Sequence, residues 1–184
     1  MIAQQTTKNL LAESLKELSR FKPVDKITIK ELTKNCGLTS PTFYNHFRDK
    51  YDLMAWIYNQ KIEDLLKNFG RENSFEDIIC RLMEITLEDE KFFLNLLKNA
   101  VSQNSFRYVT NDHAIKLLSE WIKNRHGFEE LPPTISFCLR FYMRAISEFV
   151  SDWALDKWDC SPREMAKFFV EAMPAPLKPL LLQI

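Results

Sequence analysis

Glycine is scarce in this chain of 184 residues, which holds only Gly37, Gly70 and Gly127. Average usage would place about a dozen glycines in a chain of this length. Phosphate-binding loops, dinucleotide-binding motifs and tight β-hairpins all depend on glycine. The sequence therefore disfavours a nucleotide-binding α/β enzyme and predicts a stack of helices joined by few sharp turns.

Long hydrophobic runs and paired cysteines are also missing. The longest stretch without a charged residue is Asn35–Phe47, which is only 13 residues long and largely polar, whereas a membrane span needs about 20 apolar residues. The first residues, MIAQQTTKNLL, lack the basic region and apolar core of a signal peptide. The four cysteines are scattered without a C-x-x-C motif, which disfavours a zinc site or a disulfide framework. We therefore expect a cytoplasmic protein with no metal, no cofactor and no membrane partner.

Net charge is absent overall, because 25 Lys and Arg balance 25 Asp and Glu. The balance conceals an asymmetry along the chain. Residues 1–53 hold nine basic and six acidic side chains, a net charge of +3, and the remainder carries −3. A basic segment of this kind is compatible with a nucleic-acid partner in spite of the neutral total.

Apolar periodicity, capping residues and proline breaks predict about nine helices and no strand, and hence an all-α fold. Thr28 and Glu31 form a capping-box pattern, as do Ser161 and Glu164. We expect two domains, residues 1–53 and residues 54–184. The expected helices cover approximately residues 6–20, 29–35, 40–46, 50–69, 75–87, 90–100, 111–126, 134–156 and 162–173.

The segment Ile27–Leu53 is the most informative part of the sequence. It predicts two short helices that meet at a turn containing Gly37, which is the helix-turn-helix pattern. The second helix of such a motif enters the DNA major groove. Small residues at its start would let the backbone approach the bases, and Lys50 would join the free N–H groups of the next helix in holding a phosphate.

This segment resembles the DNA-binding domain of the TetR family of bacterial transcription regulators. The resemblance covers about residues 6–55 and rests on C-G-L-T at 36–39, T-F-Y-x-H-F at 42–47, Lys50 and Leu53. Cys36 stands where the family pattern has alanine. More loosely, T-F-Y-N-H-F-R-D-K-Y-D-L-M-A-W-I-Y and the later F-Y-M-R-A-I-S-E-F-V-S-D-W resemble the DhaS-like branch, named after regulators of a dihydroxyacetone kinase operon.

The resemblance implies a homodimer on a palindromic double-stranded DNA operator, held together by the helices at about 134–156 and 162–173. Base contacts map to Ser40, Pro41 and Thr42. Phosphate contacts map to Thr28, Thr39, Tyr44, His46 and Lys50.

The family mechanism further implies a small-molecule effector bound in the body of the protein. The candidate residues are Phe93, Phe106, Tyr108, Phe137, Arg140, Phe141, Tyr142 and Arg144. The aromatic residues could equally be core packing. Arg140 and Arg144 could bind an anion, pair with Glu148 or Asp152, or lie at the dimer seam. Because the chain is short for the family, sensing through a partner protein is the alternative to a ligand pocket.

An enzymatic function has little support, since we find no catalytic triad, supported carboxylate pair, metal motif or nucleotide loop. A helical protein-interaction module, or a coactivator-dependent regulator without its own ligand pocket, is the second alternative. The intact set of candidate DNA contacts favours a DNA-binding regulator over both.

Overall fold

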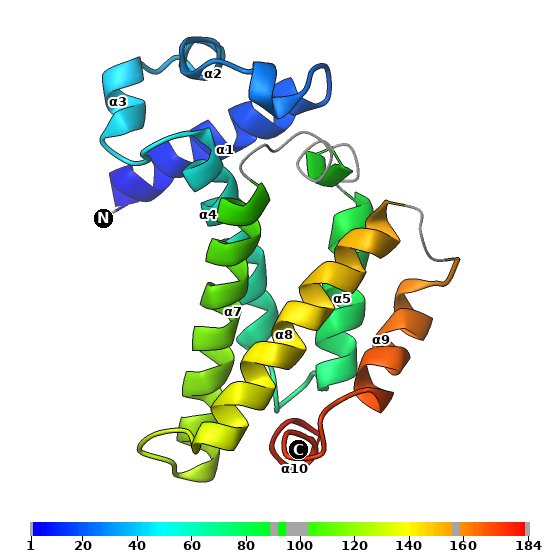
Figure 1. The fold of residues 1–184 in the computed structure, drawn as a ribbon. Coiled ribbons are helices and arrows are strands. Elements are labelled where there is room, and N and C mark those ends of the chain that lie inside the picture. The colour runs from blue at the N-terminus through cyan, green and yellow to red at the C-terminus, as the bar shows by residue number, and fades with distance from the viewer. Residues whose placement is uncertain (1, 89–91, 95–102, 156–158, 183–184) are drawn as a thin grey trace. The chain divides into compact units, whose positions relative to one another are not determined.

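The computed structural model describes residues 2–88, 92–94, 103–155 and 159–182, and the side chains of these residues apart from 2–5 and 103–108. Within them all regular structure is helical, as predicted, with nine α-helices, one 3-10 turn and no strand (Figure 1). None of these helices is both long and apolar enough to cross a membrane. The elements are α1 Ile2–Ser19, η1 Val24–Lys26, α2 Ile29–Asn35, α3 Ser40–Tyr44, α4 Lys50–Leu66, α5 Phe75–Glu88, α7 Gln103–His126, α8 Pro133–Ala154, α9 Pro162–Glu171 and α10 Lys178–Leu181.

The chain forms two compact units. The first comprises Met1–Tyr58 and Asp89–Arg107, and the second comprises Asn59–Glu88 and Tyr108–Ile184. Helix α4 therefore begins in the first unit and ends in the second.

A small apolar core holds the first unit together. Leu11 and Leu15 of α1, Leu32 of α2, Phe43 of α3 and Leu53 of α4 are each fully buried. The burial of their apolar surface supplies most of the free energy that stabilises such a short bundle. A polar contact fixes its register, because the Ser14 hydroxyl of α1 donates to the Leu32 carbonyl at 2.8 Å.

The second unit packs α5 against α9 and, less extensively, against α8 (Figure 1). Tyr142 of α8 donates its hydroxyl to the carbonyl of Phe169 in α9, and both side chains are buried. Arg163, at the start of α9, forms ion pairs with Glu76 at 3.2 Å and Asp77 at 2.9 Å at the start of α5. The first contact joins α9 to α8, and the second joins the start of α9 to the start of α5.

Several predicted helix boundaries are corrected by the structure. Helix α3 ends at Tyr44 rather than near His46, because the chain tightens into a turn in which the His46 N–H donates to Phe43 at 2.9 Å. Helix α4 ends at Leu66 rather than near Phe69, and α7 begins at Gln103 rather than near Asn111. The helix expected over 90–100 lies mostly outside the described residues. The short helix α10 was not predicted.

Candidate nucleic-acid interface

Two capped helices and a glycine turn shape the candidate interface. Thr28 and Glu31 form the predicted capping box at the start of α2, since the Thr28 hydroxyl accepts from the Glu31 N–H at 3.2 Å and the Glu31 carboxylate accepts from the Thr28 N–H at 2.9 Å. Gly37 then adopts a φ of 69°, a left-handed conformation that favours glycine. The Thr39 hydroxyl caps α3 by accepting from the Thr42 N–H at 3.3 Å. The local sequence therefore sets the angle at which α3 leaves the turn.

Helix α3 buries one side chain and leaves its neighbours accessible. Phe43 is fully buried and packs at 5.8 Å, between ring centroids, against Phe47. Tyr44 is 59% exposed and contacts Phe43 edge to face. Pro41 is exposed, whereas Ser40 and Thr42 are half-buried. The Phe43 anchor thus holds a short helix whose remaining surface is available to a partner.

The two threonine hydroxyls predicted to touch phosphates, those of Thr28 and Thr39, already have partners within the chain. Thr28 donates to the Glu31 carboxylate at 2.8 Å, and the hydroxyls of Thr39 and Thr42 lie 2.8 Å apart. Lys22 lies 2.6 Å from the same Glu31 carboxylate. The Lys22 ammonium and the Thr28 hydrogen bonds lower the pKa of Glu31 to about 2, so this cap is ionised at neutral pH.

The last two predicted DNA contacts, His46 and Lys50, differ in their surroundings. His46 is half-buried beside Phe47. The Lys50 ammonium does not extend freely from α4. It donates to the backbone carbonyls of Asp25 at 2.7 Å and Ile27 at 2.9 Å. No pattern in the sequence indicates this contact, because Lys50 lies 25 and 23 positions from its two partners.

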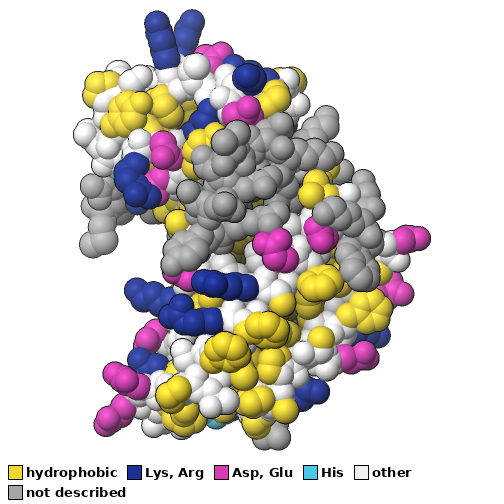
Figure 2. Space-filling model, viewed as in Figure 1, with side chains coloured by type: hydrophobic (Ala, Val, Ile, Leu, Met, Phe, Trp, Pro, Cys, Tyr) yellow, Lys and Arg dark blue, Asp and Glu magenta, His cyan; other side chains and the backbone are white. Residues whose placement is uncertain are grey.

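In the second unit, α8 presents an apolar face. Phe137 and Phe141 are 69% and 63% exposed and stack on each other with ring centroids 6.3 Å apart. Figure 2 shows hydrophobic side chains gathered over α8, with Lys and Arg side chains beside them. Arg140 and Arg144 are exposed on this helix, and neither has an ion pair within the described part of the chain. The exposed aromatic pair is available for a further contact.

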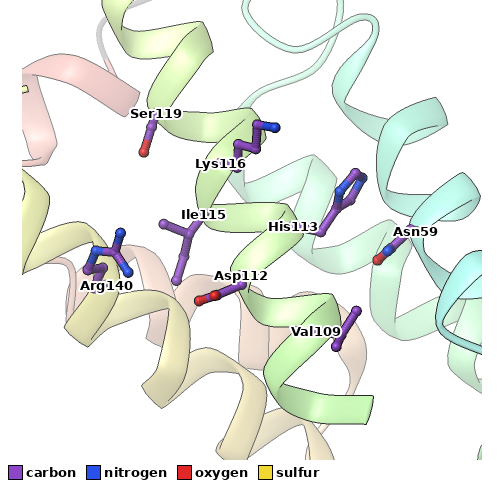
Figure 3. Close-up of a pocket in the computed structure, with 8 residues that line it drawn as sticks. All are labelled: Asn59, Val109, Asp112, His113, Ile115, Lys116, Ser119 and Arg140. Atoms are coloured by element: carbon purple, nitrogen blue, oxygen red, sulfur yellow. The ribbon is translucent and has the colours of Figure 1, made fainter. Parts of the chain in front are cut away.

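A groove of about 580 Å³ lies along α7 and is bordered by α4 and α8 (Figure 3). Arg140 reaches toward it from α8, while Asn59 of α4 and His113 of α7 lie opposite each other. The side-chain oxygen of Asn59 is buried without a hydrogen-bond partner in the described structure. Six of the eight lining residues are polar or charged: Asn59, Asp112, His113, Lys116, Ser119 and Arg140, with Val109 and Ile115 completing the set.

The structure does not bring the predicted effector residues together around this groove. Of the six whose side chains the structure describes, only Arg140 lines it. Phe93 is buried against Tyr58 in the other compact unit. Tyr142 of α8 is buried against α9. The side chains that are exposed on α8 are Phe137, Phe141 and Arg144. The side chains of Phe106 and Tyr108 lie outside those described. Among the described residues, no three His, Cys, Asp or Glu side chains are grouped as metal ligands would be.

Comparisons with known proteins agree with the helix-turn-helix geometry. A family model described as "Bacterial regulatory proteins, tetR family" matches residues 11–56, and one described as "Transcriptional regulator C-terminal region" matches residues 73–174. Over 87 residues the chain is 20% identical to the HTH-type dhaKLM operon transcriptional activator DhaS of Lactococcus lactis subsp. lactis (strain IL1403). That match spans 47% of this chain and 46% of the relative, less than half of the relative's length.

Solved structures share the fold at low sequence identity. The dihydroxyacetone kinase operon activator DhaS superposes with a TM-score of 0.64 at 16% identity, covering 95% of this chain and 98% of that one. A TetR transcriptional regulator from Rhodococcus sp. RHA1 gives a TM-score of 0.63 at 14% identity, with the same coverage. FadR of Thermus thermophilus, solved with lauroyl-CoA, gives 0.59 at 13% identity over 90% of this chain and 92% of that one. Since one matching family model spans more than half of the chain and the other spans the helix-turn-helix, the chain belongs to the TetR family of bacterial transcription regulators.

Proposed function

We propose that the chain regulates transcription by binding a palindromic operator, with α3 in the major groove of double-stranded DNA. Residues 1–53 act as the DNA-binding domain and residues 54–184 as the dimerisation and effector domain. Ser40, Pro41 and Thr42 contact base edges. Thr28, Thr39, Tyr44, His46 and Lys50 hold phosphates.

The observation that carries this proposal is the arrangement of α3. Its Thr39 cap and buried Phe43 fix a helix of five residues, and the exposed Tyr44 hydroxyl stands at its end. A short rigid helix with small residues at its start suits close approach to base edges, and a nearby phenol suits a phosphate.

The proposed partner in the protein's own assembly is a second copy of the chain. A symmetric pair of α8 and α9 helices forms a four-helix bundle, which would cover Phe137 and Phe141 of α8 and Phe168 of α9. Exposed fractions of 69%, 63% and 51% for these rings support this interface, because water contact on large aromatic surfaces is unfavourable. Two such subunits place their α3 helices in successive major grooves, about 34–36 Å apart.

We further propose that the affinity for DNA is modulated by a small molecule held in the groove along α7. Lys116 and Arg140 lack ion-pair partners among the described residues, and Asn59 offers a buried acceptor without a donor. A small molecule that carries negative charge and a hydrogen-bond donor matches these groups. A partner protein that acts in place of a small molecule is the alternative, and calorimetry with a small anionic probe separates the two.

An electrophoretic shift on the DNA upstream of the chain's own gene tests the DNA-binding role. Salt-sensitive binding is expected, since Lys and Arg contacts to phosphates release counterions. Tyr44→Ala should weaken binding about tenfold or more, as removal of a charge-assisted hydrogen bond does. Lys67→Ala, which removes an exposed lysine directly after α4 in the second unit, should bind as the unmodified chain does. Failure to shift any genomic fragment at low salt would refute the proposal.

A further inference from the structure

Lys50 connects two parts of the DNA-binding unit that are distant in sequence. It lies in the first turn of α4, and its ammonium donates to the carbonyls of Asp25 in η1 and Ile27 directly after it. These carbonyls end the turn that leads into α2. The ammonium therefore supplies donors at a place where the backbone changes direction.

Among the described residues, no backbone N–H outside the helices donates to either carbonyl, so Lys50 is their hydrogen-bond donor. The Thr28 N–H is directed to the Glu31 carboxylate, because the capping box uses it at 2.9 Å. Lys50 is half-buried, and the removal of its ammonium from water lowers its pKa, with the Asp25 carboxylate acting in the opposite direction. A partly desolvated ammonium is stable only when its donors are satisfied, and two of its three N–H groups are satisfied here.

The contact fixes the starts of two helices relative to each other. Ile27 is buried and directly precedes Thr28, the cap of α2. At the other end, Asp49 caps α4 by accepting from the Tyr51 and Asp52 N–H groups at 2.8 and 2.9 Å. Helix N-termini carry free N–H groups that can bind phosphates. The N-termini of α2 and α4 can act together only if both face the same stretch of the DNA backbone.

We propose that Lys50 is a positioning residue, which holds the start of α2 beside the start of α4 and acts on DNA affinity mainly through the placement of Thr28. This inference rests on the proposed DNA-binding function. At most one N–H of the ammonium remains for a phosphate, so the greater part of its effect passes through the protein.

A double-mutant cycle on DNA affinity tests the proposal, using Lys50→Met, Thr28→Val and both together. Each titration is run at a temperature where circular dichroism shows the variant folded. If Lys50 acts through Thr28, each single change weakens binding about tenfold and the pair weakens it no more than the worse single change. Losses that multiply, or unaltered binding by Lys50→Met, overturn the proposal.

Amide hydrogen exchange in the DNA-free protein supplies a readout that does not depend on DNA binding. The Ile27 and Leu32 amides, which donate to Val24 and Thr28, should exchange about tenfold faster in Lys50→Met. Lys16→Met, which removes a lysine paired with Glu13 on α1, is the matched control and should leave both rates unchanged. Unchanged rates in Lys50→Met overturn the proposal. If Lys50→Met exchanges faster but the unmodified chain binds no DNA, the structural role of the Lys50 contact is supported and the proposed function is refuted.

If Lys50→Met does not fold, Lys50→Gln replaces it in both experiments, because its amide keeps two N–H donors without the charge. Retention by Lys50→Gln of most of the DNA affinity and of the slow amide exchange supports positioning. Loss of affinity by Lys50→Gln with unchanged exchange shows that the charge acts on DNA directly and overturns the proposal.

Discussion

The indole ring of Trp121 occupies the space beside Gly70, where a Cβ atom on residue 70 would lie 2.5 Å from the ring carbon Cζ2. The ring is held in place, since Trp121 donates its indole N–H to the Phe69 carbonyl at 3.2 Å and lies 4.3 Å from the Phe69 ring centroid. Gly70 also has a φ of 76°. Two independent constraints therefore require glycine at this turn between α4 and α5.

Gly70→Ala should lower the free energy of unfolding by about 2–4 kcal/mol, as the sum of a left-handed backbone cost and an overpacking cost. Gly127→Ala is the matched control, because Gly127 has a φ of 74° but no atom near its missing Cβ. It should cost about 1–2 kcal/mol from the backbone alone. Urea unfolding of both variants measures the difference, and equal losses would contradict the Trp121 contact.

The Asp77 carboxylate should make the second unit sensitive to acid. Its hydrogen bond from Ser74 and its ion pair with Arg163 lower its pKa to about 2 from the ordinary 3.8. Because the folded-state pKa is lower than the unfolded one, its stabilisation is fully present above about pH 4 and is lost as the pH falls toward 2. Asp77→Asn should flatten the dependence of stability on pH across this window. A carboxyl NMR titration that gives Asp77 an ordinary pKa would contradict this prediction.

Self-association should depend on the exposed rings of α8. Phe141→Glu places a charge in the proposed four-helix interface and should raise the dimer dissociation constant by about 100-fold, as the loss of a buried aromatic contact does. Phe21→Glu alters an even more exposed ring, at 83%, in the other unit and should have no effect. Sedimentation velocity measures both variants. A wild-type chain that sediments as a monomer at micromolar concentration would exclude the dimer.

The groove along α7 should prefer polar anions to apolar ones. Citrate, which carries carboxylates and a hydroxyl donor, should bind saturably in a calorimeter, and octanoate should not. Lys116→Met should weaken the binding of citrate about tenfold, because it removes a charged hydrogen bond. Lys123→Met is the control, since Lys123 lies on the same helix, pairs with Glu120 and does not line the groove. Stronger binding of octanoate would refute the polar lining as the determinant, and no binding of either probe would favour a partner protein.

Local patterns in the sequence predicted the parts of the fold that are determined locally. The capping boxes of Thr28 with Glu31 and of Ser161 with Glu164, and the glycine turn at Gly37, were all predicted, and the structure confirms them. Each depends on residues within three positions of one another, where backbone geometry leaves few alternatives.

Contacts between distant residues could not be predicted in the same way. The distance from Lys50 to the carbonyl of Asp25 depends on how α1, α2 and α4 pack together. Similarly, the spacing of aromatic residues along α8 does not show that Tyr142 faces inward while Phe137 and Phe141 face outward. The groove along α7 combines residues of three helices whose spacing carries no recognisable motif.

Hydroxyl-radical footprinting of the chain on the DNA upstream of its own gene tests the central proposal most directly. A dimer that inserts two α3 helices into successive major grooves should protect two segments of related, inverted sequence, whose centres lie about 34–36 Å apart along the duplex. Phe141→Glu should weaken the protection of both segments together. A single protected segment, or none at low salt, would contradict the proposal that this chain binds a palindromic operator as a homodimer.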